Sequence, residues 1–325
     1  MPKSTFTRRH FLGASSALLA LPALAQGSQG YPTRPIRLVV PYPAGGSTDQ
    51  LARAIQQPLA ELLGQPVIVD NRAGAGGTIG TDFVAKAAPD GYTLAFGNTG
   101  PNAVVSLLRK VPYDPIADLQ PISTVAFTPM ILAVPADSPA RTLKEFLAYA
   151  RQQGGAMNYG SVGNGSLSHL TGEYFNELSG LKMLHVPYAG GAPMLAAFAG
   201  GQLHAAFVTG LDGASMLASG KVRYLAVATP QPTDVVPGLP AIAEEVPGFA
   251  STAWFGLLAP RRVPPEILAR LNAAVVAAVA RPEVRKLFAE RRIEARSSTP
   301  QEMEKVIAAE QEHWGRVIRK AGITS

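Results

Sequence analysis

The sequence predicts an α/β protein of two lobes that are joined by strands. Short apolar runs with strand character alternate with amphipathic helical segments, and short loops connect them, as in mainly parallel sheets covered by helices. The chain passes between the two groups of elements twice, near 123–134 and near 251–259. Two strand-like crossings indicate a hinge beside a cleft that opens and closes.

The apolar pattern gives the order of the expected elements. Strands are expected at 36–40, 67–69, 93–96, 122–127, 130–134, 157–159, 183–186, 204–208, 223–228 and 253–259. Helices are expected at 48–63, from the end of the segment DNRAGAGGTIG (70–80) to about 88, and at 142–151, 170–178 and 194–199. Further helices are expected between 208 and 223, from 265 onward, and from 300 to about 320. Thr142 and Glu145 form a capping box at one helix start. Thr299 and Glu302 form another, and Pro58 should kink the first helix.

The composition is that of a folded protein without thiol chemistry. Of the 325 residues, 47% are hydrophobic, which excludes disorder as the main state. The chain contains no cysteine, so disulfides, thiolate metal sites and a cysteine nucleophile are excluded.

The first 25 residues have the pattern of an export signal. An arginine pair at 8–9 precedes an apolar stretch at 11–24 that is too short for a membrane span, and the sequence ALA at 23–25 gives a small-x-small cleavage site before Gln26. The segment TRRHFLG is similar to a twin-arginine signal, with an ordinary secretory leader as the alternative. We expect a periplasmic protein with a signal peptide at 1–25, a first lobe of 26–127 plus 256–325, and a second lobe of 128–255.

The charge of the chain does not indicate a nucleic-acid partner. The formal net charge is +6, and three of the positive residues, Lys3, Arg8 and Arg9, lie in the export signal. Elsewhere the arginines are dispersed or lie on the C-terminal helices, and no basic stripe with interleaved aromatic residues occurs.

Two similar turns suggest a site that both lobes share. The sequence VPYPAGG at 40–46 has an echo in VPYAGG at 186–191, and each copy follows a strand and precedes an apolar helix. The carboxyl ends of strands are where open α/β sheets bind ligands. A single copy is more typical of a plain tight connection, but one copy in each lobe favours a common cleft.

Two more glycine-rich loops have the same character. YGSVGNGSLSHL at 159–170 holds neutral donors ahead of a helix, which Ser166 or Ser168 can cap, and GNTGPN at 97–102 ends another strand. Free N–H groups at helix starts suit a carboxylate, whereas a phosphate dianion usually recruits an Arg or Lys that these turns lack. Asp49 is interpreted as an acceptor of N–H groups from its own loop; the alternative is that it holds an amine of the ligand.

Enzyme signatures are weak. The sequence has no G-x-S-x-G elbow and no HExxH metal spacing, and only His169 lies beside a glycine-rich loop, where it is more typical of a helix start than of a base. The main rival is VIVDNRAGAGGTIG, which has the strand–glycine–helix order of a dinucleotide site. Its glycines at 74, 76 and 80 are one residue too widely spaced. An exported NAD(P)- or flavin-dependent oxidoreductase therefore remains the alternative function.

Several motifs together resemble one family. PYPAGGSTD, VDNRAGAGGTIGTDFVAKAAPDGYTL, YGSVGNGSLSHLTGEYF, VPYAGGAP and GKVRYLAVAT are similar to the Bug-type periplasmic receptors of tripartite tricarboxylate transporters, over nearly the whole chain after the export signal. The resemblance implies a two-lobed periplasmic binding protein (Venus flytrap) that binds a small carboxylate and performs no catalysis. That ligand would be a di- or tricarboxylate, an acidic amino acid or an aromatic acid. It also implies delivery to a membrane permease, no cofactor or metal, no nucleic acid and a monomeric state.

The resemblance also indicates the ligand loops. In the first lobe the loop is 42–49 with backbone donors at 44–47, and in the second it is 161–166, assisted by the glycine pair of VPYAGG, while GNTG lines the floor. Asp212 falls where the family often has a polar pocket residue, although VTGLDGA departs from the family's pattern. The candidate ligand-binding residues are Tyr42, Ala44, Gly45, Gly46, Ser47, Asp49, Asn98, Thr99, Ser161, Gly163, Asn164, Gly165, Ser166, His169, Gly190, Gly191 and Asp212.

Overall fold

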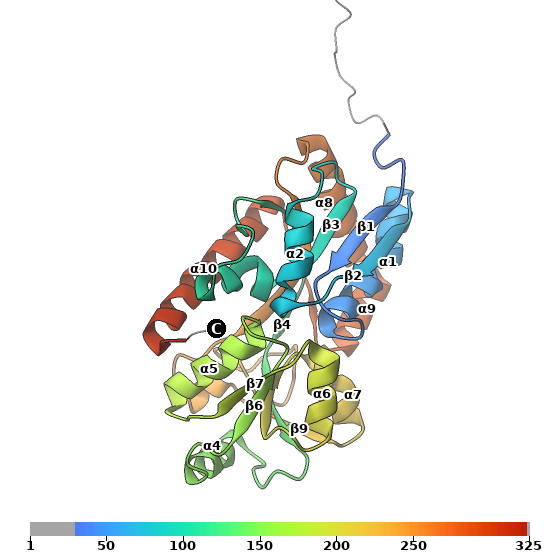
Figure 1. Cartoon of the computed structure of the whole chain (residues 1–325). Coiled ribbons are helices and arrows are strands. Elements are labelled where there is room, and N and C mark those ends of the chain that lie inside the picture. The colour runs from blue at the N-terminus through green and yellow to red at the C-terminus, as the bar shows by residue number, and fades with distance from the viewer. Residues whose placement is uncertain (1–29, 324–325) are drawn as a thin grey trace, which may run out of the picture. The chain divides into compact units, whose positions relative to one another are not determined.

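The computed structural model describes residues 30–323, and its helices and strands all belong to the unit that begins at Pro32 (Figure 1). The expected export signal, with its arginine pair and its cleavage site before Gln26, lies outside the described residues. No helix in 30–323 is both long enough and apolar enough to cross a membrane.

The described strands form two sheets, one in each lobe. The first sheet has the order β11-β4-β10-β3-β1-β2, and the second has the order β7-β6-β8-β5-β9. The strands of the first sheet are β1 (Ile36–Val40), β2 (Val67–Asn71), β3 (Thr93–Asn98), β4 (Leu119–Pro129), β10 (Thr252–Pro260) and β11 (Glu294–Ala295). The strands of the second sheet are β5 (Ile131–Pro135), β6 (Asn158–Ser161), β7 (Leu184–Pro187), β8 (Ala205–Val208) and β9 (Val222–Val227).

Helices cover both sheets, as Figure 1 shows. Those that follow strands of the first lobe are α1 (Ser47–Leu63), α2 (Thr78–Ala85), α3 (Val105–Leu108), α8 (Pro265–Ala280), α9 (Pro282–Glu290) and α10 (Pro300–Ala321). Those of the second lobe are α4 (Leu143–Gln152), α5 (Leu167–Ser179), α6 (Gly191–Ala199) and α7 (Gly210–Ala218). Short helical turns lie at Ala75–Gly77, Gly100–Val104 and Ile242–Glu244.

The expectation of mainly parallel sheets is wrong. Among the described strands, five pairings are antiparallel and four are parallel. The reason is the crossing itself: β4 leaves the first lobe, β10 returns to it, and the two strands lie side by side. Adjacent strands that cross in opposite directions must pair antiparallel, and β5 carries the direction of β4 into the second sheet, where it pairs antiparallel with β8 and β9.

The two crossings meet at a hydrogen-bonded hinge. Met130 separates β4 from β5, and its N–H donates to the carbonyl of Ser251 at 3.1 Å. The N–H of Ala228 donates to Met130 at 2.7 Å, and the N–H of Ser251 donates to Ala228 at 2.7 Å. The two-lobed α/β fold with two strand crossings is therefore confirmed, while the exact lobe boundaries at 127/128 and 255/256 stay a prediction.

The sequence of α1 explains its place on the first sheet. Leu51, Ile55 and Leu59 recur every four residues and are buried, so they form the face that packs on the sheet. Gly64 ends the helix at a φ of 73°, in the left-handed region that glycine adopts without steric cost. The helix continues through Pro58, and the kink expected there stays a prediction.

Capping also follows the sequence, with one difference. The Thr299 hydroxyl accepts the N–H of Glu302, whose carboxylate accepts the N–H of Thr299, so this capping box is confirmed. At α4 the Thr142 hydroxyl caps the helix, but the Glu145 carboxylate accepts the N–H of Arg141 instead of closing the box. Three labelled elements were not expected, the helices α3 and α9 and the two-residue strand β11.

Candidate ligand-binding site

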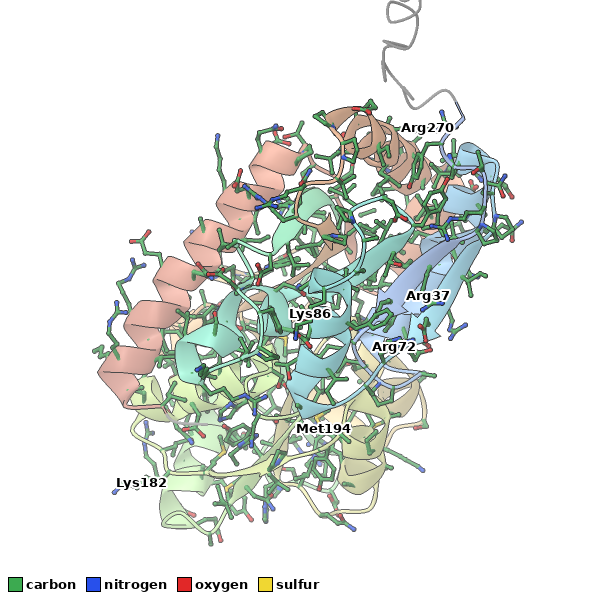
Figure 2. The ribbon with its side chains drawn as sticks, turned by 45° about the horizontal axis from the view of Figure 1, so that its top comes forward. Arg37, Arg72, Lys86, Lys182, Met194 and Arg270 are labelled. Carbon is green, nitrogen blue, oxygen red and sulfur yellow. The ribbon has the colours of Figure 1, made fainter. Side chains whose placement is uncertain are left out.

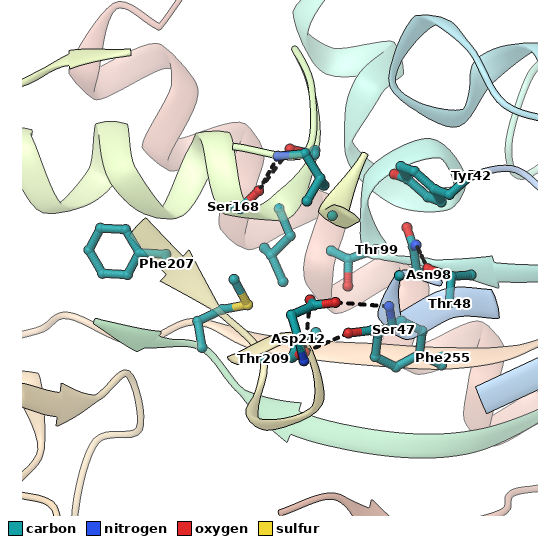
Figure 3. Close-up of a pocket in the computed structure, with 17 residues that line it drawn as sticks. Tyr42, Ser47, Thr48, Asn98, Thr99, Ser168, Phe207, Thr209, Asp212 and Phe255 are labelled. Atoms are coloured by element: carbon teal, nitrogen blue, oxygen red, sulfur yellow. Dashed lines mark hydrogen bonds between the residues drawn. The ribbon is translucent and has the colours of Figure 1, made fainter. Parts of the chain in front are cut away.

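A cavity of about 70 Å³ lies between the lobes, at the starts of helices from both (Figure 3). Eight of the candidate residues line it: Tyr42, Gly46, Ser47, Asn98, Thr99, Ser166, Gly191 and Asp212. Its volume holds several water molecules. The motifs of both lobes therefore meet at one place, as the echoed turns predict.

The start of α1 presents backbone donors to this cavity. Gly46 is the N-cap residue and supplies no side chain, so the first N–H groups of the helix are left for other partners. Ser47 and Thr48 line the cavity beside it, and the Asn98 amide donates to the Thr48 hydroxyl at 3.1 Å, which fixes both side chains. The helix dipole makes this end of α1 favourable for negative charge.

Asp49 anchors the first-lobe loop from behind the cavity. Its carboxylate accepts the N–H of Gly45 at 2.9 Å, as expected, together with Nε of Arg53 and Nδ2 of Asn71, both at 2.9 Å. Burial by itself would raise the pKa of Asp49, but these hydrogen bonds outweigh it and hold the pKa below its usual value. The carboxylate is therefore ionised, and its hydrogen bonds go to groups of the protein itself.

The start of α5 presents donors from the second lobe. The Ser166 hydroxyl accepts the N–H of His169 as the helix cap and donates to the carbonyl of Gly163 at 2.6 Å. Ser168 accepts the N–H of Val162 at 3.1 Å. These bonds hold the loop and leave the N–H groups of Leu167 and Ser168 at the cavity wall available to a ligand.

A stacked pair of histidines supports this second loop from inside. The rings of His169 and His185 lie 4.1 Å apart, Nδ1 of His169 accepts the N–H of Gly165, and Nε2 of His185 lies 2.6 Å from the Ser161 hydroxyl. Burial lowers the pKa of His169 to about 4, and burial together with the neighbouring ring lowers the pKa of His185 to about 3. Both rings are neutral near pH 7. Ser161 is fully buried, so this Ser–His contact is not an exposed nucleophile.

Nine candidate residues lie near the cavity without lining it: Ala44, Gly45, Asp49, Ser161, Gly163, Asn164, Gly165, His169 and Gly190. They shape the loops whose ends reach the cavity. Six of them take part in the bonds just described, namely Gly45, Asp49, Ser161, Gly163, Gly165 and His169. Their proposed part in ligand binding stays a prediction.

The remaining wall comes from residues outside the set of candidate ligand-binding residues. Thr48, Met130, Val162, Leu167, Ser168, Phe207, Thr209, Ala253 and Phe255 also line the cavity. Six of the nine are apolar, and four of these come from the hinge and the central strands β8 and β10. Thr48 and Val162 lie within the predicted ligand loops 42–49 and 161–166. Asp212 is the only charged residue among the described residues that line the cavity.

The lysine and arginine residues of the described part of the chain are absent from the cavity lining. Lys182 and Arg270 lie at the outer edges of the two lobes (Figure 2). Arg72 forms a salt bridge with Asp70 at 2.8 Å, and its guanidinium lies over the ring of Phe83. No group of three or more His, Asp or Glu side chains in 30–323 is arranged to hold a metal ion.

The glycine-rich segment that resembles a dinucleotide site has a contact with the other lobe. Gly76 has a φ of 66°, and a Cβ there would collide with the carbonyl oxygen of Asn164. The hydroxyl of Tyr42 donates to the carbonyl of Gly76 at 3.2 Å, and burial raises the pKa of Tyr42 well above its usual value, so it stays protonated. The segment thus packs against the second-lobe ligand loop at Asn164.

The comparison with known proteins decides the family. The model of the tripartite tricarboxylate transporter family receptor matches residues 51–323. The chain belongs to this receptor family. The resemblance that the motifs indicate is thereby confirmed, and this receptor is 35% identical to the protein BugT of Bordetella pertussis over 295 residues, which are 90% of each chain.

Solved structures agree with the assignment. Rpa4515 of Rhodopseudomonas palustris, described with adipate, matches this receptor with a TM-score of 0.88 and 37% identity, over 91% of this chain and 99% of its own. MatC of the same species, described with bound malate, matches with a TM-score of 0.84 and 33% identity, over 89% and 100%.

Proposed function

We propose that this receptor captures a small organic carboxylate in the cleft between its lobes and delivers it to permease subunits of a tripartite transporter. The observation that carries the proposal is that the N-termini of α1 and α5, one from each lobe, reach the same cavity. Each helix start contributes about half a positive charge and N–H groups that have no partner within the helix. A ligand in contact with both helix starts would hold the lobes together, which couples capture to closure.

The cavity favours binding over conversion. Apart from Asp212, the described residues that line it are uncharged, and they include no histidine or lysine that could act as a base. Similar proteins described with adipate and with malate support an organic acid as the ligand. The alternative, an exported oxidoreductase, is disfavoured because its glycine segment is packed against the other lobe.

The proposed place of action is the periplasm, where a soluble monomer would shuttle between ligand and permease. The export signal at 1–25 supports this, and its arginine pair suggests the twin-arginine route. Replacement of Arg8 and Arg9 by lysine should stop export only if that route is used. Retention of the leader on a protein that stays in the cytoplasm would contradict the proposed location.

A ligand screen tests the function. The chain from Gln26 onward is unfolded, refolded to remove any bound acid, and examined by thermal shift with organic acids, followed by calorimetry on those that raise the melting temperature. We expect at least one carboxylate to bind, to be recovered unchanged, and to bind with little dependence on salt, because a buried helix-terminus site is weakly screened. Conversion of the acid, or a nicotinamide or flavin absorbance in the purified protein, would support the oxidoreductase instead.

A further inference from the structure

Asp212 places a carboxylate of the protein itself inside the cleft. Its Oδ1 accepts the N–H of Ser47, the first residue of α1 in the opposite lobe, at 2.9 Å (Figure 3). Its Oδ2 accepts the hydroxyl of Thr209 at 2.9 Å, and the hydroxyls of Ser47 and Thr209 lie 2.6 Å apart. The positive end of α1 therefore already has an acidic partner.

The surroundings of Asp212 are fitted to this position. A Cβ on Gly191 would lie 3.2 Å from Oδ1, so glycine leaves the space in which the carboxylate lies. The N–H of Asp212 donates to the Thr209 hydroxyl at 3.1 Å, which ties the backbone and the side chain of α7 to the same threonine. The carboxylate is thus held by both lobes at a defined point of the cavity wall.

Because of Asp212, the two ends of the cavity differ in charge. At the α1 end, an anionic ligand group would lie beside the Asp212 carboxylate, and no cationic side chain among the described lining residues would offset the repulsion. At the α5 end, the N–H groups of Leu167 and Ser168 remain without an acidic neighbour in the cavity. Apolar side chains, among them those of Met130 and Phe207, also line the cavity.

We propose that Asp212 restricts this receptor to acids with a single carboxylate, whose opposite end is uncharged or carries a hydrogen-bond donor such as an ammonium group. The inference rests on the proposed function and narrows its ligand class. The ligand carboxylate binds at α5, its carbon chain lies on the apolar wall, and its opposite end lies at Asp212. A second carboxylate is rejected because like charges in contact repel strongly where water is excluded.

Matched acids of equal length test this role by calorimetry. The probes are the dicarboxylates succinate, glutarate and adipate, the monocarboxylates butyrate, valerate and caproate, and the amino acids γ-aminobutyrate, δ-aminovalerate and ε-aminocaproate. For the chain length that binds best, we expect the wild type to prefer the monocarboxylate over the dicarboxylate by at least about tenfold. Asp212→Asn keeps the shape and an acceptor for the Ser47 N–H, and we expect it to reduce that preference by about tenfold and to weaken binding of the amino acid relative to the plain acid.

The control is Asp234→Asn, which removes an exposed charge of the second lobe away from the cavity and should leave the preference unchanged. Equal binding of a dicarboxylate and its matching monocarboxylate by the wild type would overturn the role of Asp212, as would a preference that Asp212→Asn leaves unchanged. In both of these cases the receptor function would stand. Failure of every probe and every acid of the wider screen to bind would instead overturn the proposed function, and this inference with it.

Discussion

An ideal Cβ on Gly46 would lie 3.8 Å from the amide nitrogen of Gly191, so these two glycines face each other across the cleft at van der Waals distance. They belong to the echoed turns VPYPAGG and VPYAGG, and the prediction that the turns face one another is confirmed. A methyl group on Gly46 fits between the two backbones.

Gly46→Val should therefore prevent full closure of the cleft. The branched methyl groups would reach the Gly191 backbone before the two helix starts approach each other, so we expect affinity for the carboxylate found in the ligand screen to fall by at least about tenfold. Calorimetry measures the affinity, and small-angle scattering with and without ligand measures compaction. The wild type should compact on binding, and the variant should not.

The matched control is Gly46→Ala. Its Cβ makes an ordinary contact at 3.8 Å, so we expect affinity within about threefold of the wild type. Both variants lose the same N-cap glycine, and their melting temperatures should be similar. Full affinity and full compaction in Gly46→Val would show that the paired glycines are plain connections and that the ligand lies elsewhere.

Alanine substitutions at two other glycines, Gly76 and Gly64, distinguish an effect on closure of the cleft from an effect of backbone strain. Gly76 and Gly64 have similar φ values of 66° and 73°, but a Cβ on Gly76 would collide with Asn164 of the other lobe, whereas a Cβ on Gly64 would meet nothing within 4 Å. Alanine at either position should lower the free energy of unfolding by about 1 kcal/mol, because its φ is left-handed. Affinity should fall in Gly76→Ala and stay unchanged in Gly64→Ala.

Denaturant unfolding and calorimetry on the same two proteins check this prediction. The wild type measured in parallel gives the reference for both quantities. Equal affinities in the two variants would mean that the glycine-rich segment AGAGG at 73–77 takes no part in closure of the cleft.

The fold could be predicted because its signals are local. Strand and helix starts follow from Gly–Gly turns, from the Thr299–Glu302 capping box and from the regular spacing of Leu51, Ile55 and Leu59. Strand direction could not be predicted in the same way, since the pairing of β4 with β10 joins segments more than 120 residues apart. Only the tertiary structure shows that these two crossing strands are neighbours.

Most candidate residues that line the cavity lie in glycine-rich turns, and the family resemblance adds Asp212. Phe207 and Phe255 have the pattern of core residues in β8 and β10, and nothing in their local sequence indicates that they face a cavity. Ser161, in contrast, ends β6 directly before the glycine-rich loop that holds Asn164, yet its side chain turns inward to His185. Side-chain direction within a loop depends on the partners that the fold brings to it.

Glu310 on α10 gives a prediction for the effect of pH on stability. Burial raises the pKa of Glu310 from 4.5 to about 7, although Nε1 of Trp314 donates to its carboxylate at 2.8 Å. The same region of α10 contacts the second lobe, where Tyr174 of α5 packs against Trp314 and His313. Charging Glu310 therefore costs stability in a helix that contacts both lobes.

Glu310→Gln should remove this cost. Because the folded pKa lies above the unfolded one, the native state holds the proton between pH 4.5 and about 7 while the unfolded chain releases it, so the stability of the wild type falls as the pH rises through this range. Glutamine keeps an acceptor for Trp314 and has no proton to lose. We expect the variant to match the wild type near pH 4 and to exceed it by about 1–3 kcal/mol at pH 8, as measured by urea unfolding. Glu304→Gln, an exposed change on the same helix, is the control, and parallel stability curves for Glu310→Gln and the wild type from pH 4 to 8 would contradict the buried, protonated state of Glu310.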